Sequence, residues 1–240
     1  NMTKRISALI LILAAICTLS CQPRNDKMAA PGFLSTTMDS VVMISAAVDV
    51  ADEDGKIHVY DWSGSGWAAD QKQLPDGSLK IMFRTAGHVL DVVDALESEN
   101  EDGRVVSGWF TFTYQNGEKL RAPYTEARFE PGDSGYIWVF EDHWRPTLKD
   151  GDPSKVRLGD TLYAVGCPLG MGYSVTTGSL AMRISRIEDF LNVPCWLATV
   201  MVAHGNSGGP ILNEGGEVVA HVVGVMAGTG WQFSILQPRR

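Results

Sequence analysis

A serine flanked by glycines near the end of this 240-residue chain has the surroundings that a nucleophile needs. Ser207 lies in the segment Gly-Asn-Ser-Gly-Gly-Pro over residues 205–210. Glycine allows backbone angles that other residues resist, and it removes bulk from around the hydroxyl. The backbone N–H groups of Gly205 and Ser207 can then converge on one point, as an oxyanion hole requires. The segment therefore indicates attack by a serine hydroxyl on a carbonyl group.

A serine hydroxyl is a weak nucleophile, so it needs a base within hydrogen-bond reach and an acid that orients this base. His88 is the first candidate base, because it closely follows the apolar strand expected over residues 79–83. Taken alone, a histidine in such a context is more often structural. His204 lies in the loop of Ser207 and either lines the substrate cleft or is a solvated loop residue. The remaining histidines lie in apparent strands (His58 and His221) or in a charged loop (His143).

The candidate acid is Asp133, which precedes the apolar run over residues 136–140. This placement would put a carboxylate at the mouth of a buried strand. An ordinary turn aspartate is the alternative interpretation, because turns favour this residue type. Glu130 is the nearest rival for the role.

The elements that must position these residues are expected to be strands. From Val41 onward the chain alternates short apolar runs with turn residues, and Asp-Gly or Asn-Gly pairs begin at residues 54, 76, 102, 116 and 150. Such pairs are strong hairpin signals. Helical periodicity is scarce, with one short candidate over residues 89–97. Many short strands with frequent turns indicate an all-β barrel or sandwich.

Three motifs in the order His, Asp, Ser resemble the trypsin-like serine proteases. Residues 205–210 resemble the nucleophile motif of that family, and Thr-Ala-Gly-His over residues 85–88 is similar to its Thr-Ala-Ala-His motif. The resemblance implies an all-β fold of two six-stranded antiparallel β-barrels, with the active site in the cleft between them. It also implies that His88 acts as general base and then general acid, that Asp133 orients His88, and that Ser207 forms the acyl-enzyme. The oxyanion would be bound by the N–H groups of Gly205 and Ser207.

Smaller features are similar to the HtrA/Deg-like branch of this family. They are Gly-Ser-Gly-Trp over residues 64–67, Gly-Cys-Pro-Leu-Gly over 166–170, Ser-Val-Thr-Thr-Gly over 174–178, Asn206, and Phe-Ser-Ile over 233–235. The likeness covers residues 41–236. The C-terminal PDZ domain of the branch does not follow here, so we expect no peptide sensing by such a module.

Substrate contacts are expected on both sides of Ser207. By its position relative to Ser207, Met201 should lie near the base of the primary specificity pocket, and no acid occurs from Met201 to Asn206. A pocket with a methionine floor would give a buried Lys or Arg no partner, so we expect cleavage after small or medium apolar residues. Residues 222–226 would pair with the bound peptide as an added strand. The expected contacts are Met201, His204, Val223, Gly224 and Val225.

The N-terminal residues read as an export signal. Lys4 and Arg5 precede an almost wholly apolar run from Ile6 to Leu19, which suits a signal peptide better than a membrane span. A small residue before Cys21 resembles a bacterial lipoprotein signal, in which that cysteine is lipidated. The expected division is a signal peptide over 1–20, a polar tether over 21–40 and a protease domain over 41–240. We expect export to the bacterial cell envelope, either in the periplasm or lipid-anchored, or else secretion.

Composition limits the partners. The formal charge is −8, so the protein has no electrostatic reason to bind nucleic acid or an anionic membrane surface. No clustered His/Cys spacing and no phosphate-cradling glycine loop is present, and we expect no metal and no cofactor. The expected partners are proteins or peptides, with membrane contact through a lipid at Cys21. Cys167 and Cys195 are either one disulfide or two buried thiols.

The sequence thus predicts an exported serine endopeptidase and leaves two alternatives. Ser134-Gly135 departs from the residues that usually follow the family's Asp, which leaves open a catalytically impaired binding or scaffold protein of the cell envelope. An α/β-hydrolase would share the Gly-x-Ser-x-Gly pattern. However, its triad runs Ser, acid, His, and His221 is the one histidine that follows Ser207.

Overall fold

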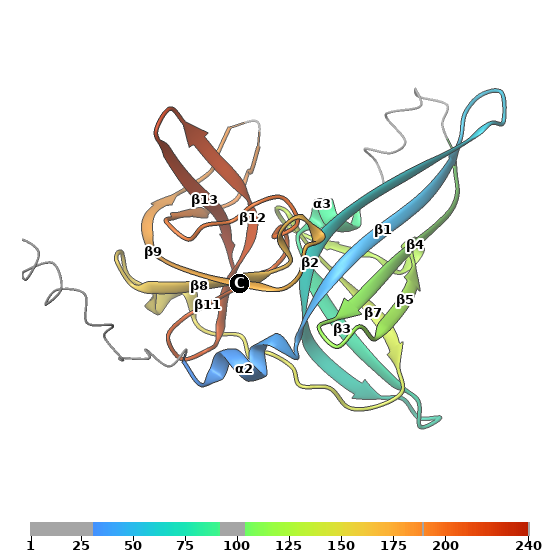
Figure 1. The fold of residues 1–240 in the computed structure, drawn as a ribbon, viewed down its shortest axis with the longest axis horizontal. Coiled ribbons are helices and arrows are strands. Elements are labelled where there is room, and N and C mark those ends of the chain that lie inside the picture. The colour runs from blue at the N-terminus through green and yellow to red at the C-terminus, as the bar shows by residue number, and fades with distance from the viewer. Residues whose placement is uncertain (1–30, 92–103, 189, 240) are drawn as a thin grey trace, which may run out of the picture. The chain divides into compact units, whose positions relative to one another are not determined.

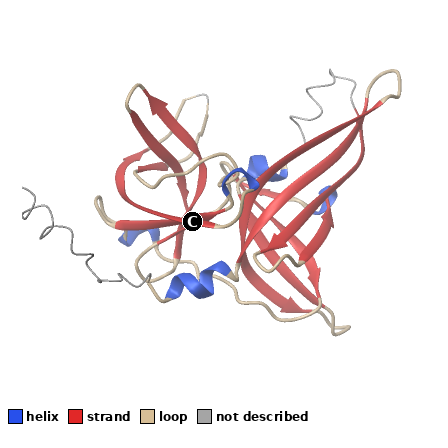
Figure 2. Ribbon diagram, in the orientation of Figure 1, coloured by secondary structure: helices blue, strands red, loops and turns tan. Residues whose placement is uncertain are grey.

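The computed structural model describes residues 31–91, 104–188 and 190–239, and strands dominate this part of the chain (Figure 2). The chain separates after Gly32 into a short first unit and a second unit, residues 33–240, which carries the fold. The second unit contains the helices α2 (Phe33–Met38) and α3 (Gly87–Leu90) and the helical turns η1 (Tyr124–Glu126), η2 (Pro153–Lys155) and η3 (Pro168–Gly170). Among the described residues, no helix has the length and apolar character needed to cross a membrane.

The first group of strands forms a seven-stranded antiparallel sheet in the order β5-β4-β1-β2-β3-β7-β6, coloured blue to green-yellow in Figure 1. Its strands are β1 (Val41–Ala51), β2 (Ile57–Gln73), β3 (Leu79–Thr85), β4 (Arg104–Tyr114), β5 (Lys119–Pro123), β6 (Arg128–Glu130) and β7 (Ser134–Glu141). The sheet curls so that β5 also contacts β7. Its concave face buries apolar side chains, among them Phe83 and Phe112, whose rings stack at 4.7 Å.

The second group closes into a six-stranded barrel in the order β10-β13-β12-β11-β8-β9, coloured yellow to red in Figure 1. Its strands are β8 (Thr161–Gly166), β9 (Ser174–Ile184), β10 (Cys195–Ala198), β11 (Pro210–Leu212), β12 (Val218–Gly228) and β13 (Trp231–Pro238). Alternate residues of these strands point inward, and Leu162, Leu180, Ile211 and Leu236 fill the interior.

The all-β double-barrel prediction is confirmed, with one difference in detail. The first barrel is a curved sheet of seven strands rather than a closed ring of six. The turns follow the predicted chemistry, because Gly55, Gly77 and Gly117 adopt positive φ angles of 78°, 88° and 88° in their hairpins. Of the helix expected over 89–97, the described part reaches Leu90 in α3.

The fold begins earlier than the predicted boundary at Val41. Part of the expected tether, Phe33–Met38, forms α2 and packs against the second barrel, with Leu34 buried. The ring of Phe33 meets the ring of Tyr163 edge-on at 5.4 Å. Apolar burial therefore draws this segment into the folded unit. The predicted signal peptide and Cys21 lie outside the described residues.

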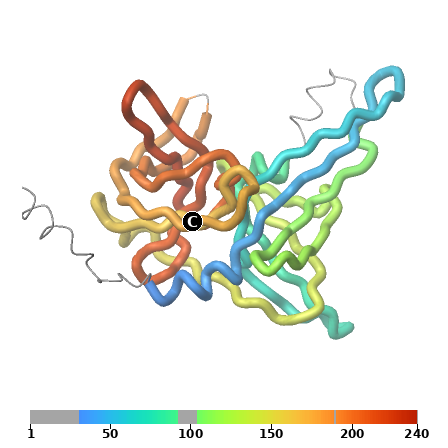
Figure 3. The backbone as a smooth tube through the Cα atoms, in the orientation of Figure 1, coloured from blue at the N-terminus to red at the C-terminus, as the bar shows by residue number. Residues whose placement is uncertain are grey.

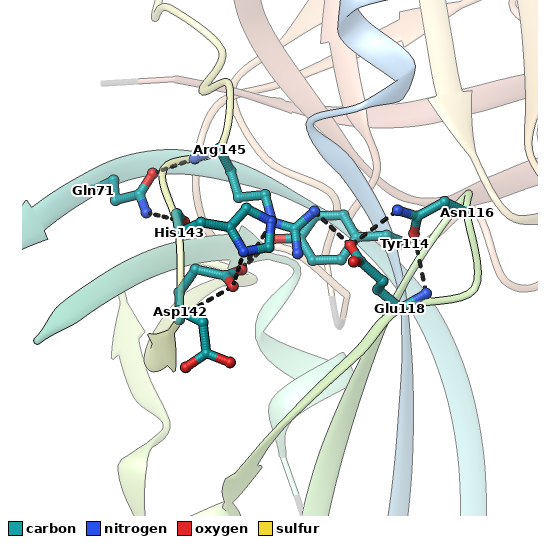
Figure 4. A network of polar contacts seen from close by, with 8 residues as sticks. Gln71, Tyr114, Asn116, Glu118, Asp142, His143 and Arg145 are labelled. Atoms are coloured by element: carbon teal, nitrogen blue, oxygen red, sulfur yellow. Dashed lines mark hydrogen bonds and ion pairs between the residues drawn. The ribbon is translucent and has the colours of Figure 1, made fainter.

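The chain passes from the first group of strands to the second through residues 142–160, a path that can be followed in Figure 3. A polar network fastens the start of this path to the first sheet (Figure 4). The Arg145 guanidinium lies 3.0 Å from the buried Glu141 and 2.6 Å from Glu118. The Gln71 amide accepts a hydrogen bond from Arg145 N at 2.7 Å and donates one to His143 O at 3.0 Å.

Candidate active site

The loop that carries Ser207 lies between β10 and β11 and depends on two glycines with positive φ. Gly205 has a φ of 90° and Gly208 a φ of 79°. A Cβ atom at Gly208 would collide with Thr85 Oγ1 and with the Ser65 carbonyl oxygen. No other residue fits there, because both the dihedral angle and the space require glycine.

Ser65 of β2 joins this loop to the first sheet. Its backbone N–H donates to Ser207 O at 2.7 Å, and its hydroxyl donates to Gly205 O at 2.6 Å. The same hydroxyl accepts a hydrogen bond from Cys167 N at 2.8 Å. Ser65 is fully buried, so these bonds are shielded from water.

The N–H groups of Gly205 and Ser207 make no hydrogen bond within the described structure. Each N–H belongs to a planar trans peptide whose C=O group, from the preceding residue, already accepts a hydrogen bond. His204 O accepts from Leu169 N at 2.7 Å, and Asn206 O accepts from Gly209 N at 2.9 Å. Because N–H and C=O point in opposite directions in a trans peptide, both N–H groups are directed away from these partners. They remain available for the predicted oxyanion.

His88 and Asp133 form a two-point contact. Asp133 Oδ2 lies 2.6 Å from His88 Nδ1, and Asp133 Oδ1 accepts the backbone N–H of His88 at 2.7 Å. Burial alone would raise the pKa of Asp133, but the hydrogen bonds and the charge of the His88 ring outweigh it and hold that pKa below its ordinary value. A charged carboxylate accepts hydrogen bonds, so Nδ1 carries the proton and Nε2 is left as the basic nitrogen.

His88 and Ser207 come from different groups of strands and line the same cleft. Both belong to the walls of two cavities, of about 560 and 1070 Å³. The smaller cavity is bounded by Tyr60, Trp62 and His204, among others. Within the described structure, no hydrogen bond joins the Ser207 hydroxyl to His88. Such bonds are often long in the free enzyme and tighten when substrate binds.

The structure places four of the five predicted substrate contacts on the cleft. His204, Val223, Gly224 and Val225 line the larger cavity. In the described part of the barrel, β12 pairs beyond Val222 with β13 and with no strand on its other side. This edge is therefore open to an added strand next to Ser207.

The structure does not place Met201, the predicted base of the specificity pocket, beside these four residues. Its side chain is 72% exposed, and it lines neither cavity. Val200 and Val202 on either side are buried, and this alternation turns Met201 outward. Gln232 lies on the cavity wall instead, and its amide donates to Val202 O at 3.3 Å.

Two exposed aromatic residues, Phe129 and Phe190, also line the larger cavity and were missed by sequence reasoning. Phe129 lies in β6, and Phe190 lies in the connection between β9 and β10. No sequence motif marks either residue, because their positions at the cavity depend on how distant segments of the chain pack together. The Phe190 ring lies 3.2 Å from the position that a Cβ atom of Gly224 would occupy.

Cys167 and Cys195 are free thiols, so the possible disulfide is not formed. Cys167 packs beside the loop of Ser207, and burial raises its pKa to about 11. Cys195 lies in β10 within a separate apolar cluster that includes Leu191 and Ile235. No group of His, Cys, Asp and Glu in the described ranges is arranged to hold a metal ion.

Comparisons with known proteins identify the family and the fold. Residues 64–220 match the family model of the trypsin-like peptidase domain. A Halomonas elongata protein named "Probable periplasmic serine endoprotease DegP-like" is 36% identical over 154 residues, which are 64% of this chain and 30% of the relative. A protein of the same name from Pseudomonas putida strain W619 is 39% identical over 74 residues, 31% of this chain and 15% of the relative.

A solved structure shares the fold. The structure titled "HtrA-type protease AlgW with decapeptide" matches with a TM-score of 0.62 at 16% identity, and the match covers 86% of this chain and 62% of that one. At this identity the likeness concerns the fold.

The chain belongs to the family of trypsin-like peptidases. The two relatives described above carry DegP-like names, and the solved structure is titled an HtrA-type protease. The chain spans less than a third of the length of the two curated relatives described above.

Proposed function

We propose that this protein is a serine endopeptidase that hydrolyses peptide bonds through His88, Asp133 and Ser207. The observation that carries the proposal is the pair of hydrogen bonds from His88 to Asp133, of 2.6 and 2.7 Å, on a cleft that Ser207 also lines. Asp133 holds the His88 tautomer that leaves Nε2 free to accept a proton.

The reaction follows from these positions. His88 Nε2 takes the proton of the Ser207 hydroxyl while Ser207 Oγ attacks the carbonyl carbon of the substrate. The N–H groups of Gly205 and Ser207 stabilise the negative oxygen of the tetrahedral intermediate. His88 then gives its proton to the leaving amine, and the peptide bond breaks to leave an acyl-enzyme on Ser207. Water, activated by His88, hydrolyses this ester and restores the hydroxyl.

The substrate is an extended peptide that pairs with the open edge of β12 at Val223–Val225. We propose a preference for small or medium apolar residues before the scissile bond. With Met201 turned outward, this preference rests on Val202, Val222 and Val223, which line the cavity beside Ser207. Profiling a peptide library tests the preference, and a clear choice of Lys or Arg would contradict it.

Export to the cell envelope is proposed for the whole protein, because its relatives are named periplasmic. Residues 1–20 would be the signal peptide, and Cys21 the lipidated N-terminus. Mass spectrometry of the mature protein tests both points. A mature chain that starts at unmodified Cys21, or elsewhere, would refute the lipid anchor.

Covalent labelling tests the catalytic assignment. A fluorophosphonate probe should label the native protein and not the Ser207→Ala variant. Equal labelling of both proteins would remove Ser207 as the nucleophile. Failure to label a folded native protein would favour the alternative of a catalytically impaired binding protein.

A further inference from the structure

The backbone of Asp133 is held on both sides by side chains of the second barrel. Its N–H donates to Gln237 Oε1 at 2.8 Å, and its carbonyl oxygen accepts a hydrogen bond from His221 Nε2 at 2.7 Å. Asp133 precedes β7 of the first sheet, whereas His221 lies on β12 and Gln237 on β13. The candidate acid of one group of strands is thus fixed by the other group.

His221 and Gln237 lie directly opposite each other in the register of β12 and β13. Both are buried, at 1% and 5% exposure. The cross-strand pair therefore presents one donor, His221 Nε2, and one acceptor, Gln237 Oε1, to the backbone of Asp133. A neighbouring strand in a β-sheet offers the same pair of groups through its backbone.

The loop before Asp133 is shaped to accept this pair. The Gln237 amide donates a second hydrogen bond to Pro131 O at 3.0 Å. Gly132 has a φ of 82°, and a Cβ atom there would lie 2.6 Å from Gln237 Oε1. Glycine at this position lets the amide lie directly against the backbone.

The His221 ring is held in one tautomer. A carbonyl oxygen can accept but not donate, so Nε2 carries the proton. Nδ1 is buried and has no partner in the described structure. Burial lowers the pKa of His221 to about 4, against the hydrogen bond to Asp133, which raises it. The charged or titratable groups around the ring are Asp133, His88, Arg239, Arg84 and Glu130.

We propose that His221 and Gln237 are positioning residues that set the orientation of the Asp133 carboxylate toward His88. The inference rests on the proposed function, because it gives a role to the triad acid. Fixing the N–H and the C=O of one residue fixes the peptide planes on both sides of its Cα. The two carboxylate oxygens then stay aligned with the ring and backbone N–H groups of His88. A loss of this alignment lowers turnover, because small displacements in a catalytic site are costly.

A matched pair of substitutions tests His221. His221→Gln can place an amide nitrogen where Nε2 lies, whereas the shorter side chain in His221→Asn cannot reach Asp133 O. We expect His221→Asn to lower kcat on the order of 10²-fold with KM within about twofold, and His221→Gln to recover most of that loss. Rates are expressed per folded molecule, measured by circular dichroism and urea unfolding. Equal kcat values for the native protein and His221→Asn would overturn the inference.

Gln237→Leu tests the second half of the pair and has a matched control in Gln71→Leu. Gln71 also binds two backbone groups through its amide, at His143 and Arg145, and lines neither cavity of the cleft. Both substitutions should lower the stability of the protein. We expect Gln237→Leu to lower kcat about tenfold or more, and Gln71→Leu to leave kcat at the native value. Equal effects of the two on kcat would show that a general loss of stability is responsible.

An Asp133→Ala background separates a positioning role from a structural one. If His221 acts through the carboxylate, His221→Asn causes no further loss of kcat there, because the aligned group is already gone. A full further loss would refute the inference.

Ser207→Ala distinguishes a failure of the proposed function from a failure of the positioning role. An active Ser207→Ala protein would refute the proposed function, whereas an inactive one beside fully active His221→Asn and Gln237→Leu would refute the positioning role.

Discussion

The hydroxyl of Ser65 donates a hydrogen bond of 2.6 Å to the carbonyl oxygen of Gly205, across the two groups of strands. The backbone N–H of Ser65 holds the carbonyl of Ser207 at 2.7 Å. One buried residue of β2 therefore fixes both residues whose N–H groups are the candidate oxyanion donors.

Replacement of Ser65 should affect both stability and turnover. Ser65→Ala leaves Gly205 O without its donor and Cys167 N without its acceptor, both in a buried place. We expect the free energy of unfolding to fall by about 1–3 kcal/mol and kcat to fall about tenfold. Urea unfolding and peptide hydrolysis measure the two effects. Ser78→Ala, which removes an exposed turn hydroxyl, should change stability by less than about 0.5 kcal/mol.

Asp133→Asn tests the role of the triad acid. An amide keeps the shape of the carboxylate, but its NH₂ group can donate a hydrogen bond to His88 Nδ1. The ring proton then lies on Nε2, which can no longer act as the base. We expect kcat to fall about 10⁴-fold with the fold intact. The exposed Asp142, replaced in the same way, should leave kcat unchanged. Peptide hydrolysis by Asp133→Asn at a rate within tenfold of the native rate would assign the orienting role to another residue.

The buried His221 predicts a loss of stability in mild acid. The pKa of His221 is about 4 in the folded protein and near the ordinary histidine value of about 6.5 in the unfolded chain, so between these pH values the unfolded chain binds more protons. The contribution of neutral His221 to the free energy of unfolding is fully present above pH 6.5 and falls by about 3 kcal/mol as the pH drops to 4. Urea unfolding from pH 7 to pH 4 measures the slope. His221→Phe should remove this part of it, and an unchanged slope would contradict the assignment.

Two glutamate substitutions compare the predicted and observed walls of the pocket. Gln232→Glu would place a carboxylate on the cavity beside Val202, and we expect it to raise cleavage after Lys or Arg. Met201→Glu would place the carboxylate in solvent, and we expect an unchanged cleavage profile. Peptide-library profiling of both variants decides between them. If Met201→Glu alone gained cleavage after Lys or Arg, Met201 would be assigned to the specificity pocket.

The candidate triad and the fold class were predictable because they depend on local signals. Thr-Ala-Gly-His over 85–88 and the glycines around Ser207 are short segments whose residue types indicate the local backbone conformation. The Asp-Gly and Asn-Gly turns likewise specify hairpins without reference to distant residues.

The supporting contacts were not predictable, because they join residues far apart in the chain. His221 was expected in a strand, and that was correct, but its bond to Asp133 depends on how the two groups of strands meet. The outward turn of Met201 depends on which of its neighbours enters the barrel. The early start of the fold at Phe33 depends on an apolar surface of the second barrel that a linear pattern does not reveal.

The bonds from the second barrel to Asp133 have a consequence for a population of these molecules. His88 and Asp133 belong to one half of the fold and Ser207 to the other. On the proposed function, separation of the two halves would abolish the triad, so a partly unfolded copy would become a substrate for intact copies without being able to cleave them.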